Sequence, residues 1–202
     1  YLELRPGDLR THLQLAQLYL LLSEPDKAEA RARTVLAVDE TSVEALNLLA
    51  NALALQGMHV ESAEVFRQLS DLAPDSTRTR VALGSQQIIA GDTDAGRRAL
   101  EQAVLEDPES IVARERLIEA RLALGDLDGS AAAAEDYLRD FPTNARARVF
   151  LGRLRLQQRR TDTAESLFEQ AVELDTRSIL AYSGLAAIAV FENDMTKAQA
   201  VL

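Results

Sequence analysis

The chain has 202 residues and a formal net charge of −10, and it contains no cysteine. It therefore has no disulfide or thiolate site, and its acidic balance argues against nucleic-acid binding, which needs clustered positive charge. Hydrophobic residues make up 47% of the chain but aromatic residues only 4%, so the core must consist mainly of Leu, Ala and Val. Because Leu and Ala favour helices, we expect an all-α protein. No apolar stretch approaches the roughly 18 residues of a membrane span, so we expect no direct membrane insertion.

The prolines reveal an internal repeat. Pro74, Pro108 and Pro142 are 34 residues apart, and Pro6 lies twice that distance before Pro74. A fixed period of this length is typical of repeat architectures. Without any insertion or deletion the chain divides into the end of a preceding repeat at 1–8, full repeats at 9–42, 43–76, 77–110, 111–144 and 145–178, and a partial repeat at 179–202.

Taken in chain order, each repeat reads as a helix, a short turn and a second helix. The seventh residue is always Leu, and the eighth is small in every repeat but the fourth, which has Ile118. The twentieth residue is always Ala, Ser or Gly. Small residues at two fixed positions predict that the two helices of a repeat cross at close range.

The fifteenth residue of each repeat marks the predicted turn. It is Gly57, Gly91 or Gly125 in the second to fourth repeats, and Arg159 in the fifth. Glycine tolerates the positive φ that ends many helices, and an Asp or Thr shortly after it can cap the next helix. We therefore expect a tight turn between the two helices of each repeat.

This pattern resembles the tetratricopeptide repeat, whose signature combines Leu, a small residue, Ala, Phe and Pro at fixed spacing. The residues that carry the resemblance are Leu49, Ala50, Phe66 and Pro74 in the second repeat, and Leu151, Gly152, Ala164, Phe168 and Ala171 in the fifth. The resemblance covers essentially the whole chain. It implies a right-handed α-solenoid of antiparallel helix pairs and, because both ends fall inside helices, a fragment of a longer array.

The chain also departs from the family pattern. Only the last repeat has the early aromatic residue, Tyr182, and its place is taken elsewhere by His12, Leu46, Arg80, Arg114 and Arg148. Thr176 stands where the proline of the fifth repeat would be. We therefore expect packing between repeats to depend on aliphatic side chains.

The resemblance implies a concave groove lined by the first helix of each repeat. The candidate groove residues are Gln17, Asn47, Asn51, Ser85, Glu115, Glu119, Arg146, Val149 and Arg153. Such a surface suits an extended peptide or an amphipathic helix, and a polysaccharide is an alternative partner. Asn47 and Asn51 share one helix face, where they either bind a ligand's backbone or are simply solvated amides. The family's clamp for a C-terminal carboxylate is not expected, because Lys27 and Lys197 both fall outside the groove.

Residues 146–160 contain six arginines, and the fifth repeat is the only one whose basic residues outnumber its acidic ones. The repeat phase predicts that Arg146 and Arg153 face the groove, where Glu119 can pair with Arg153. It places Arg148 and Arg155 on the packing side and the last two arginines, 159 and 160, in the turn. The cluster therefore reduces to two candidate contacts for a charged partner.

Signals for catalysis, metals and cofactors are weak. Residues 91–98, GDTDAGRR, lack the Lys and the preceding strand of a phosphate-binding loop. Residues 126–130, DLDGS, are followed by Ala131 and Tyr137 where a calcium loop needs Gly and Glu. His12 and His59 have no second ligand at metal spacing. We expect no enzyme activity, no metal and no cofactor.

The sequence is compatible with two functions. The first is a non-enzymatic scaffold, which the resemblance associates with bacterial cell-envelope or exopolysaccharide export and biosynthesis assemblies, so the periplasm or envelope is favoured over the cytoplasm. The second is the substrate-recruiting arm of a larger enzyme, such as a glycosyltransferase or sulfotransferase. A further possibility is self-association through the helix that ends at Leu202, since exposed apolar end faces favour stacking.

Overall fold

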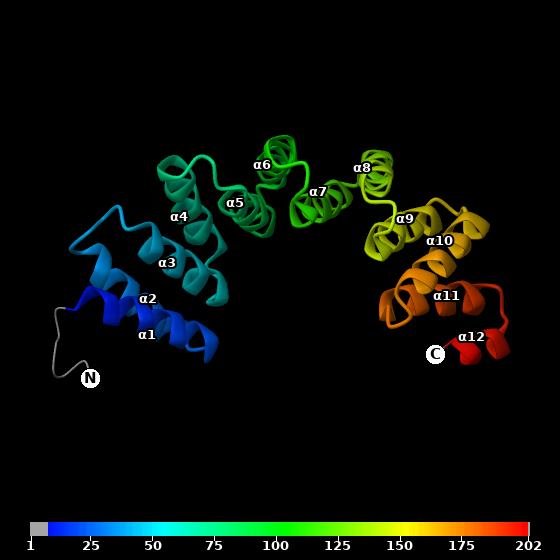
Figure 1. The fold of residues 1–202 in the computed structure, drawn as a ribbon, viewed down its shortest axis with the longest axis horizontal. Helices are drawn as coiled ribbons and strands as arrows, with labels where there is room; N and C mark the ends of the chain where they lie inside the picture. Colours follow the sequence, from blue (N-terminus) through cyan, green and yellow to red (C-terminus); the bar gives the residue numbers. More distant parts are fainter. Residues whose placement is uncertain (1–7, 202) are drawn as a thin grey trace. The chain divides into compact units, whose positions relative to one another are not determined.

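The computed structural model describes residues 8–201, apart from the side chains of Lys197, Ala200 and Val201. The preceding repeat expected at 1–8, except for Asp8, and the helix end at Leu202 lie outside the described residues. Within the described part the chain forms twelve α-helices and no strand (Figure 1). This result confirms the all-α fold expected from the composition.

The helices alternate between a first and a second helix of each repeat. The first helices are α1 (Leu9–Leu21), α3 (Val43–Leu55), α5 (Thr77–Ile89), α7 (Ile111–Ala123), α9 (Ala145–Gln157) and α11 (Ile179–Phe191). The second helices are α2 (Pro25–Leu36), α4 (His59–Leu72), α6 (Thr93–Glu106), α8 (Leu127–Asp140), α10 (Thr161–Leu174) and α12 (Met195–Val201). Each first helix begins 34 residues after the previous one.

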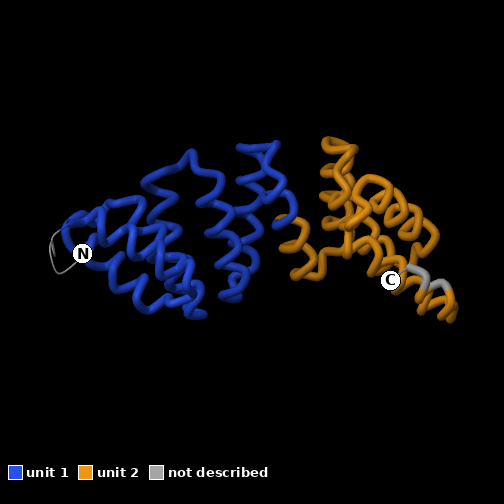
Figure 2. Tube along the Cα trace, turned by 60° about the horizontal axis from the view of Figure 1, so that its bottom comes forward, with its two compact units in different colours: residues 1–116 blue, residues 117–202 orange. Residues whose placement is uncertain are grey.

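The chain divides into two compact units, residues 1–116 and 117–202, with the boundary inside α7 (Figure 2). In unit 1 each helix from α1 to α6 packs against the next one in the chain, and α1 also contacts α3. In unit 2 the same holds from α8 to α12, and α9 also contacts α11. Each unit is thus built from contacts between neighbours in the sequence.

The two helices of a repeat cross at the small residues that the sequence singled out. In the third repeat, a Cβ added to Gly96 would lie 2.5 Å from the carbonyl oxygen of Gly84. In the second repeat, the buried Ser62 hydroxyl donates a 2.8 Å hydrogen bond to the carbonyl oxygen of Ala50. Close crossing is confirmed, because there is no room for a larger side chain between these backbones.

The turns within the repeats have the positive φ that the glycines predicted. Gly57, Gly91 and Gly125 have φ between 75° and 93°, and the non-glycine residues at this position also have positive φ, Arg159 at 60° among them. Asp92 and Asp126 cap α6 and α8 through their side chains. Capping by threonine was a wrong expectation, because Thr93 and Thr161 are instead the first residues of helices.

Arginine fills the position of the missing family aromatic. Arg80, Arg114 and Arg148 each donate a hydrogen bond of 2.6–2.8 Å to the carbonyl oxygen of the proline six residues earlier. Arg80 also forms an ion pair with Glu106, on the second helix of its own repeat. The expectation that packing between repeats depends on aliphatic side chains was therefore incomplete, because guanidinium groups also hydrogen-bond the loops between repeats to the first helices.

Each unit has its own apolar core. In unit 1, Phe66 and Leu69 of α4 pack with Leu46 and Ala50 of α3. In unit 2, Phe168 of α10 is fully buried between α9 and α11, and a Cβ added to Gly152 or Gly184 would lie 2.9 Å or 2.5 Å from its ring. In unit 2 a second helix, α10, is thus packed between two first helices.

Candidate binding groove

The candidate residues of unit 1 lie on the first helices α1, α3 and α5. Gln17 and Asn51 are exposed, and Asn47 and Ser85 are half-buried. Asn51 Nδ2 donates to the side-chain oxygen of Asn47 at 2.7 Å, which confirms that the two amides share a face. Because each amide group has both donors and an acceptor, this bond leaves Asn47 Nδ2 and Asn51 Oδ1 to contact a partner. Ser85 donates its hydroxyl to the Val81 carbonyl oxygen at 2.8 Å.

The candidate residues on α7 and α9 differ in exposure. Glu119, Arg146 and Arg153 are exposed. Val149 is 3% exposed and packs in the core that contains Phe168. Glu115 is only 9% exposed. Val149 and Glu115 therefore offer a partner little surface, and Val149 contributes to packing beneath the exposed face of α9.

Glu119 and Arg153 meet at one small cavity of unit 2. The cavity has a volume of about 90 Å³ and is lined by Ile118, Glu119, Leu122, Phe150, Arg153, Leu154 and Gln157. The structure thus places at one cavity the two residues that the repeat phase put side by side. The predicted ion pair between them is not formed, because Arg153 has no ion-pair partner among the described residues.

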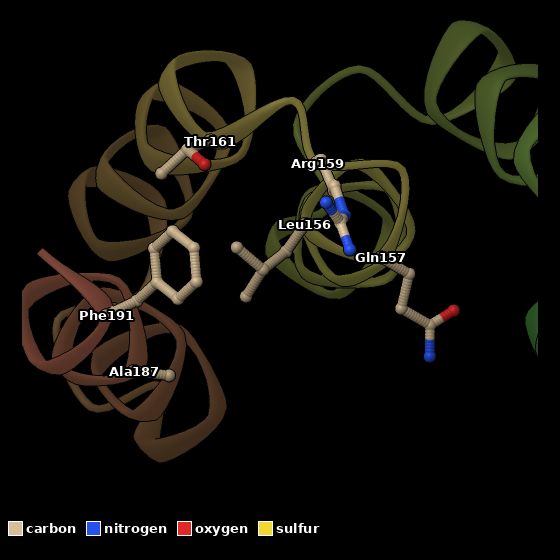
Figure 3. Close-up of a pocket in the computed structure, with 6 residues that line it drawn as sticks. All are labelled: Leu156, Gln157, Arg159, Thr161, Ala187 and Phe191. Atoms are coloured by element: carbon tan, nitrogen blue, oxygen red, sulfur yellow. The ribbon is translucent and has the colours of Figure 1, made fainter.

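Two larger cavities follow along unit 2. One, of about 490 Å³, is lined by Leu156, Gln157, Arg159, Thr161, Ala187 and Phe191 (Figure 3). The other, of about 560 Å³, is lined by Ser183, Ala186, Ala187, Val190, Met195, Ala198 and Gln199. In Figure 3 the side chains of Leu156 and Phe191 point toward one another, and Gln157 points away from them.

The three cavities adjoin one another, because the first two share Gln157 and the last two share Ala187. We call the surface that they form the unit 2 groove. It runs from α7 across α9 to α11, with Glu119 and Arg153 lining the cavity between α7 and α9 and a mixture of apolar and polar side chains along the rest.

The arginines of residues 146–160 separate by their contacts. Arg148 bonds to the Pro142 carbonyl oxygen, and Arg155 forms an ion pair with Glu135 on α8. These two arginines have the packing roles that the repeat phase predicts. In the described part of the chain, the side chains of Arg153, Arg159 and Arg160 have no hydrogen-bond or ion-pair partner.

Sequence reasoning missed the aromatic residues of the unit 2 groove. Phe191 is 79% exposed and is the thirteenth residue of its repeat, a position outside the four assigned to the concave groove. A signal was present, because the same position holds Leu21, Leu55 and Ile89, which are 58–78% exposed. An apolar residue recurring at one repeat position marks either a core face or a surface that other molecules cover.

Other site chemistry is limited in the described residues. No cluster of three or more His, Asp or Glu side chains is arranged to hold a metal ion among them, and His59 Nδ1 lies 3.0 Å from Gln86 Oε1. No helix among them is both long and apolar enough to cross a membrane. In unit 1, the pKa of Glu29, on α2, is lowered by hydrogen bonds from Gln56 and Arg33.

Comparisons with known proteins agree with the geometry. A family model described as a tetratricopeptide repeat matches residues 13–77 and 115–179, more than half of the chain. The starts of the two matches are three 34-residue periods apart. No curated protein matches the sequence.

Solved structures share the fold at low sequence identity. A tetratricopeptide repeat protein from Parabacteroides merdae has a TM-score of 0.79 at 15% identity, covering 96% of this chain and 77% of that one. The pilF protein of Pseudomonas aeruginosa has a TM-score of 0.74 at 16% identity, with 96% and 88% covered. YrrB, described as a repeat protein with an unusual peptide-binding site, has a TM-score of 0.66 at 18% identity, with 90% and 94% covered.

Proposed function

This chain belongs to the tetratricopeptide repeat family, and from that premise we propose that it is a non-enzymatic scaffold that binds a peptide segment of a partner protein in the unit 2 groove. The observation that carries the proposal is the series of three cavities along α7, α9 and α11, each of which shares a lining residue with the next. Concave sites with apolar lining and few polar groups are the usual form of ligand sites in proteins. The fold of YrrB, which has a peptide-binding site, is similar.

The chemistry of the groove suits a peptide with both apolar and charged side chains. Leu156, Ala187 and Phe191 offer apolar surface along its middle. Glu119 and Arg153 offer opposite charges at its α7 end, which would orient a charged segment. An extended chain or an amphipathic helix presents side chains at spacings that fit such a surface.

The test is to block the groove at the residue that two cavities share. Peptides selected from a randomised library on the wild-type protein should bind Ala187→Arg at least about tenfold more weakly, because the long side chain fills the cavities on both sides. Ala132→Arg, on the exposed surface of α8, is the matched control and should bind as the wild type does. Equal affinity for the wild type and Ala187→Arg would disprove the groove as the binding site.

A second test addresses the predicted charged contacts. Arg146→Ala combined with Arg153→Ala should weaken binding of a charged peptide by about threefold to tenfold, as expected for exposed ion pairs. Circular dichroism should show unchanged helix content, because both side chains are exposed. Unchanged affinity in a folded variant would remove these arginines from the site.

We also propose a place for the scaffold in a bacterial cell-envelope assembly, including one for exopolysaccharide export or biosynthesis. The support for the envelope is the resemblance to bacterial arrays, and the preference for Arg over Lys, with Lys27 and Lys197 the two lysines of the chain, supports a bacterial source only. Fractionation of the source bacterium tests this proposal. Recovery of the protein in the cytoplasm alone would contradict it.

A further inference from the structure

The turn between α9 and α10 departs from the turns of the two preceding repeats. The third and fourth repeats have a Gly-Asp pair there, at residues 91–92 and 125–126, whereas the fifth has Arg159 and Arg160. Both replacements act against local stability. Arg159 has φ 60°, a left-handed conformation that is unfavourable for a residue with a Cβ.

The second arginine replaces a capping residue. Asp92 and Asp126 accept hydrogen bonds from backbone N–H groups of α6 and α8. Arg160 is at the equivalent position of α10 and makes no capping bond with its side chain. A positive charge at a helix N-terminus is also opposed by the helix dipole. This turn therefore lacks two stabilising features that the turns of the third and fourth repeats have.

One of the two arginines lies at the surface of the unit 2 groove, and the other follows it in the chain. Arg159 lines the 490 Å³ cavity together with Leu156 and Phe191 (Figure 3). Both arginines are exposed, and over residues 8–201 neither side chain has a hydrogen-bond or ion-pair partner. Residues that add a local conformational cost, and whose side chains make no internal contact, are candidates for contact with another molecule.

The turns of unit 1 supply a contrast. Leu55 and Ile89, at the repeat position of Phe191, are exposed beside Gly57 and Gly91. Unit 1 therefore has exposed apolar side chains next to its turns but no arginine in them. An aspartate two residues into the second helix is common to the third, fourth and fifth repeats, at positions 94, 128 and 162. The arginine pair is what distinguishes the fifth.

We propose that the cavity between α9 and α11, which we call the Arg159 pocket, binds an acidic peptide segment of the partner. A bulky apolar side chain of that segment enters between Leu156 and Phe191. Adjacent Asp or Glu carboxylates pair with Arg159 and Arg160, whose planar guanidinium groups match carboxylates. This inference rests on the proposed function and specifies the charge and composition of the peptide.

The probe is a nonamer peptide library with Leu or Phe fixed at the centre and all other positions randomised, with blocked termini. Peptides retained on the wild-type protein are sequenced, and we expect enrichment of Asp and Glu beside the fixed residue. Added salt should weaken binding of the enriched peptides, because exposed charge pairs are screened. Neutral or basic residues at these positions would overturn the inference.

Arg159→Gly combined with Arg160→Asp restores the turn of the neighbouring repeats and should raise the melting temperature. The enriched acidic peptides should bind this variant about tenfold more weakly, although its fold is more stable. Phe191→Ala should weaken all retained peptides, acidic or not, whereas Leu55→Ala, at the same repeat position in unit 1, should have no effect.

The outcomes separate the two proposals. If Phe191→Ala weakens binding but the arginine variant does not, the acidic partner is wrong and the groove stands. If the library is not retained at all, both proposals fail. If the protein sediments as a dimer that Phe191→Ala dissociates, the occupant is a second copy of the chain, and the acidic partner is again wrong.

Discussion

Arg159 shows how one residue can be unfavourable for the fold and still be retained by it. Its backbone has φ 60° at a position where glycine occurs in three other repeats. The turn keeps this shape because the surrounding backbone hydrogen bonds impose it, such as the 2.9 Å bond from Arg160 N to Arg155 O. The backbone hydrogen bonds of the turn therefore outweigh the conformational cost of a non-glycine residue at this position.

Replacing Arg159 alone by Gly should stabilise the protein by about 0.5–1 kcal/mol, because the strain of the left-handed conformation is relieved while the unfolded chain gains some entropy. Chemical denaturation measures the change. Gly125→Arg, in the equivalent turn of the fourth repeat, should have the opposite effect. A loss of stability in Arg159→Gly would show that the arginine has a structural role.

The backbone of a neighbouring helix leaves no room for a side chain at Gly96. A Cβ there would lie 2.5 Å from the Gly84 carbonyl oxygen and from Ile88 Cγ1. We expect Gly96→Ala to destabilise the protein by about 1–3 kcal/mol, as overpacking does. Gly129→Ala is the control, because the atoms nearest to its Cβ would belong to the Asp126 side chain and not to a backbone, so its cost should be limited to the loss of the Asp126 cap, about 1 kcal/mol. Equal losses would argue against close crossing as the cause.

At the scale of helices, arginine hydrogen bonds connect the loop between repeats to the following first helix. Arg148 donates hydrogen bonds to the Pro142 carbonyl oxygen at 2.6 Å and to Gln170 Oε1 at 3.2 Å. It therefore links α9 both to the preceding loop and to α10. The contact recurs at Arg80 and Arg114. The guanidinium group presents five donors in a fixed fork, so it can bond in two directions with little loss of side-chain freedom.

Arg148→Lys should therefore lower the free energy of unfolding by about 1 kcal/mol, because one ammonium group replaces a fork that serves two acceptors. Thermal or chemical denaturation provides the measurement. Arg153→Lys is the matched control on the same helix, since Arg153 is exposed and has no such partners. Similar stability for both variants would contradict the linking role of Arg148.

A second contact between helices is sensitive to pH. The Gln56 amide, at the end of α3, donates to Glu29 on α2 at 2.8 Å, and with Arg33 it lowers the pKa of Glu29 below its ordinary value. A lowered carboxylate pKa stabilises the fold above the unfolded-state pKa. This stabilisation is lost as the pH falls through the pKa of the folded state.

Gln56→Leu should raise the pKa of Glu29 and reduce stability at neutral pH by about 0.5 kcal/mol, a small value because the pair is partly exposed. The difference from the wild type should vanish under acidic conditions, where Glu29 is protonated in both proteins. NMR titration of Glu29 and denaturation as a function of pH measure both effects. If the difference in stability persisted at low pH, its cause would be packing and not the charge of Glu29.

At the scale of the molecule, each unit is stabilised by contacts between helices that are neighbours in the chain. Repeat proteins of this kind behave as nearly one-dimensional systems, in which stability is the sum of local terms. Damage in one repeat should therefore spread to its neighbours and fade with distance along the chain.

Phe168→Ala should lower hydrogen-exchange protection in α9, α10 and α11 much more than in α3 and α4, because its ring is fully buried among the first three. The local loss should be about 3–5 kcal/mol. Phe66→Ala, in the core of unit 1, should give the reverse pattern. A uniform loss over the whole chain in either variant would contradict local cooperativity.

Much of this arrangement follows from the sequence, because the period of 34 residues repeats without interruption. Small residues marked the helix crossings, and glycine marked the turns, because each feature depends on local geometry that one side chain can permit or forbid. The same reasoning misassigned threonine as a cap. It also missed the arginine contacts, because these need a partner six residues away in a loop whose path the pattern does not define.

The sequence by itself determined the all-α class, the repeat register and the tight turns, since periodicity and backbone preference are local properties. Only the tertiary structure decided what the groove contains. It buried Val149, joined Glu119 and Arg153 at one cavity, and exposed Phe191 beside Arg159. These outcomes depend on how neighbouring first helices pack against the second helix between them, which sets the side chains that remain at the surface.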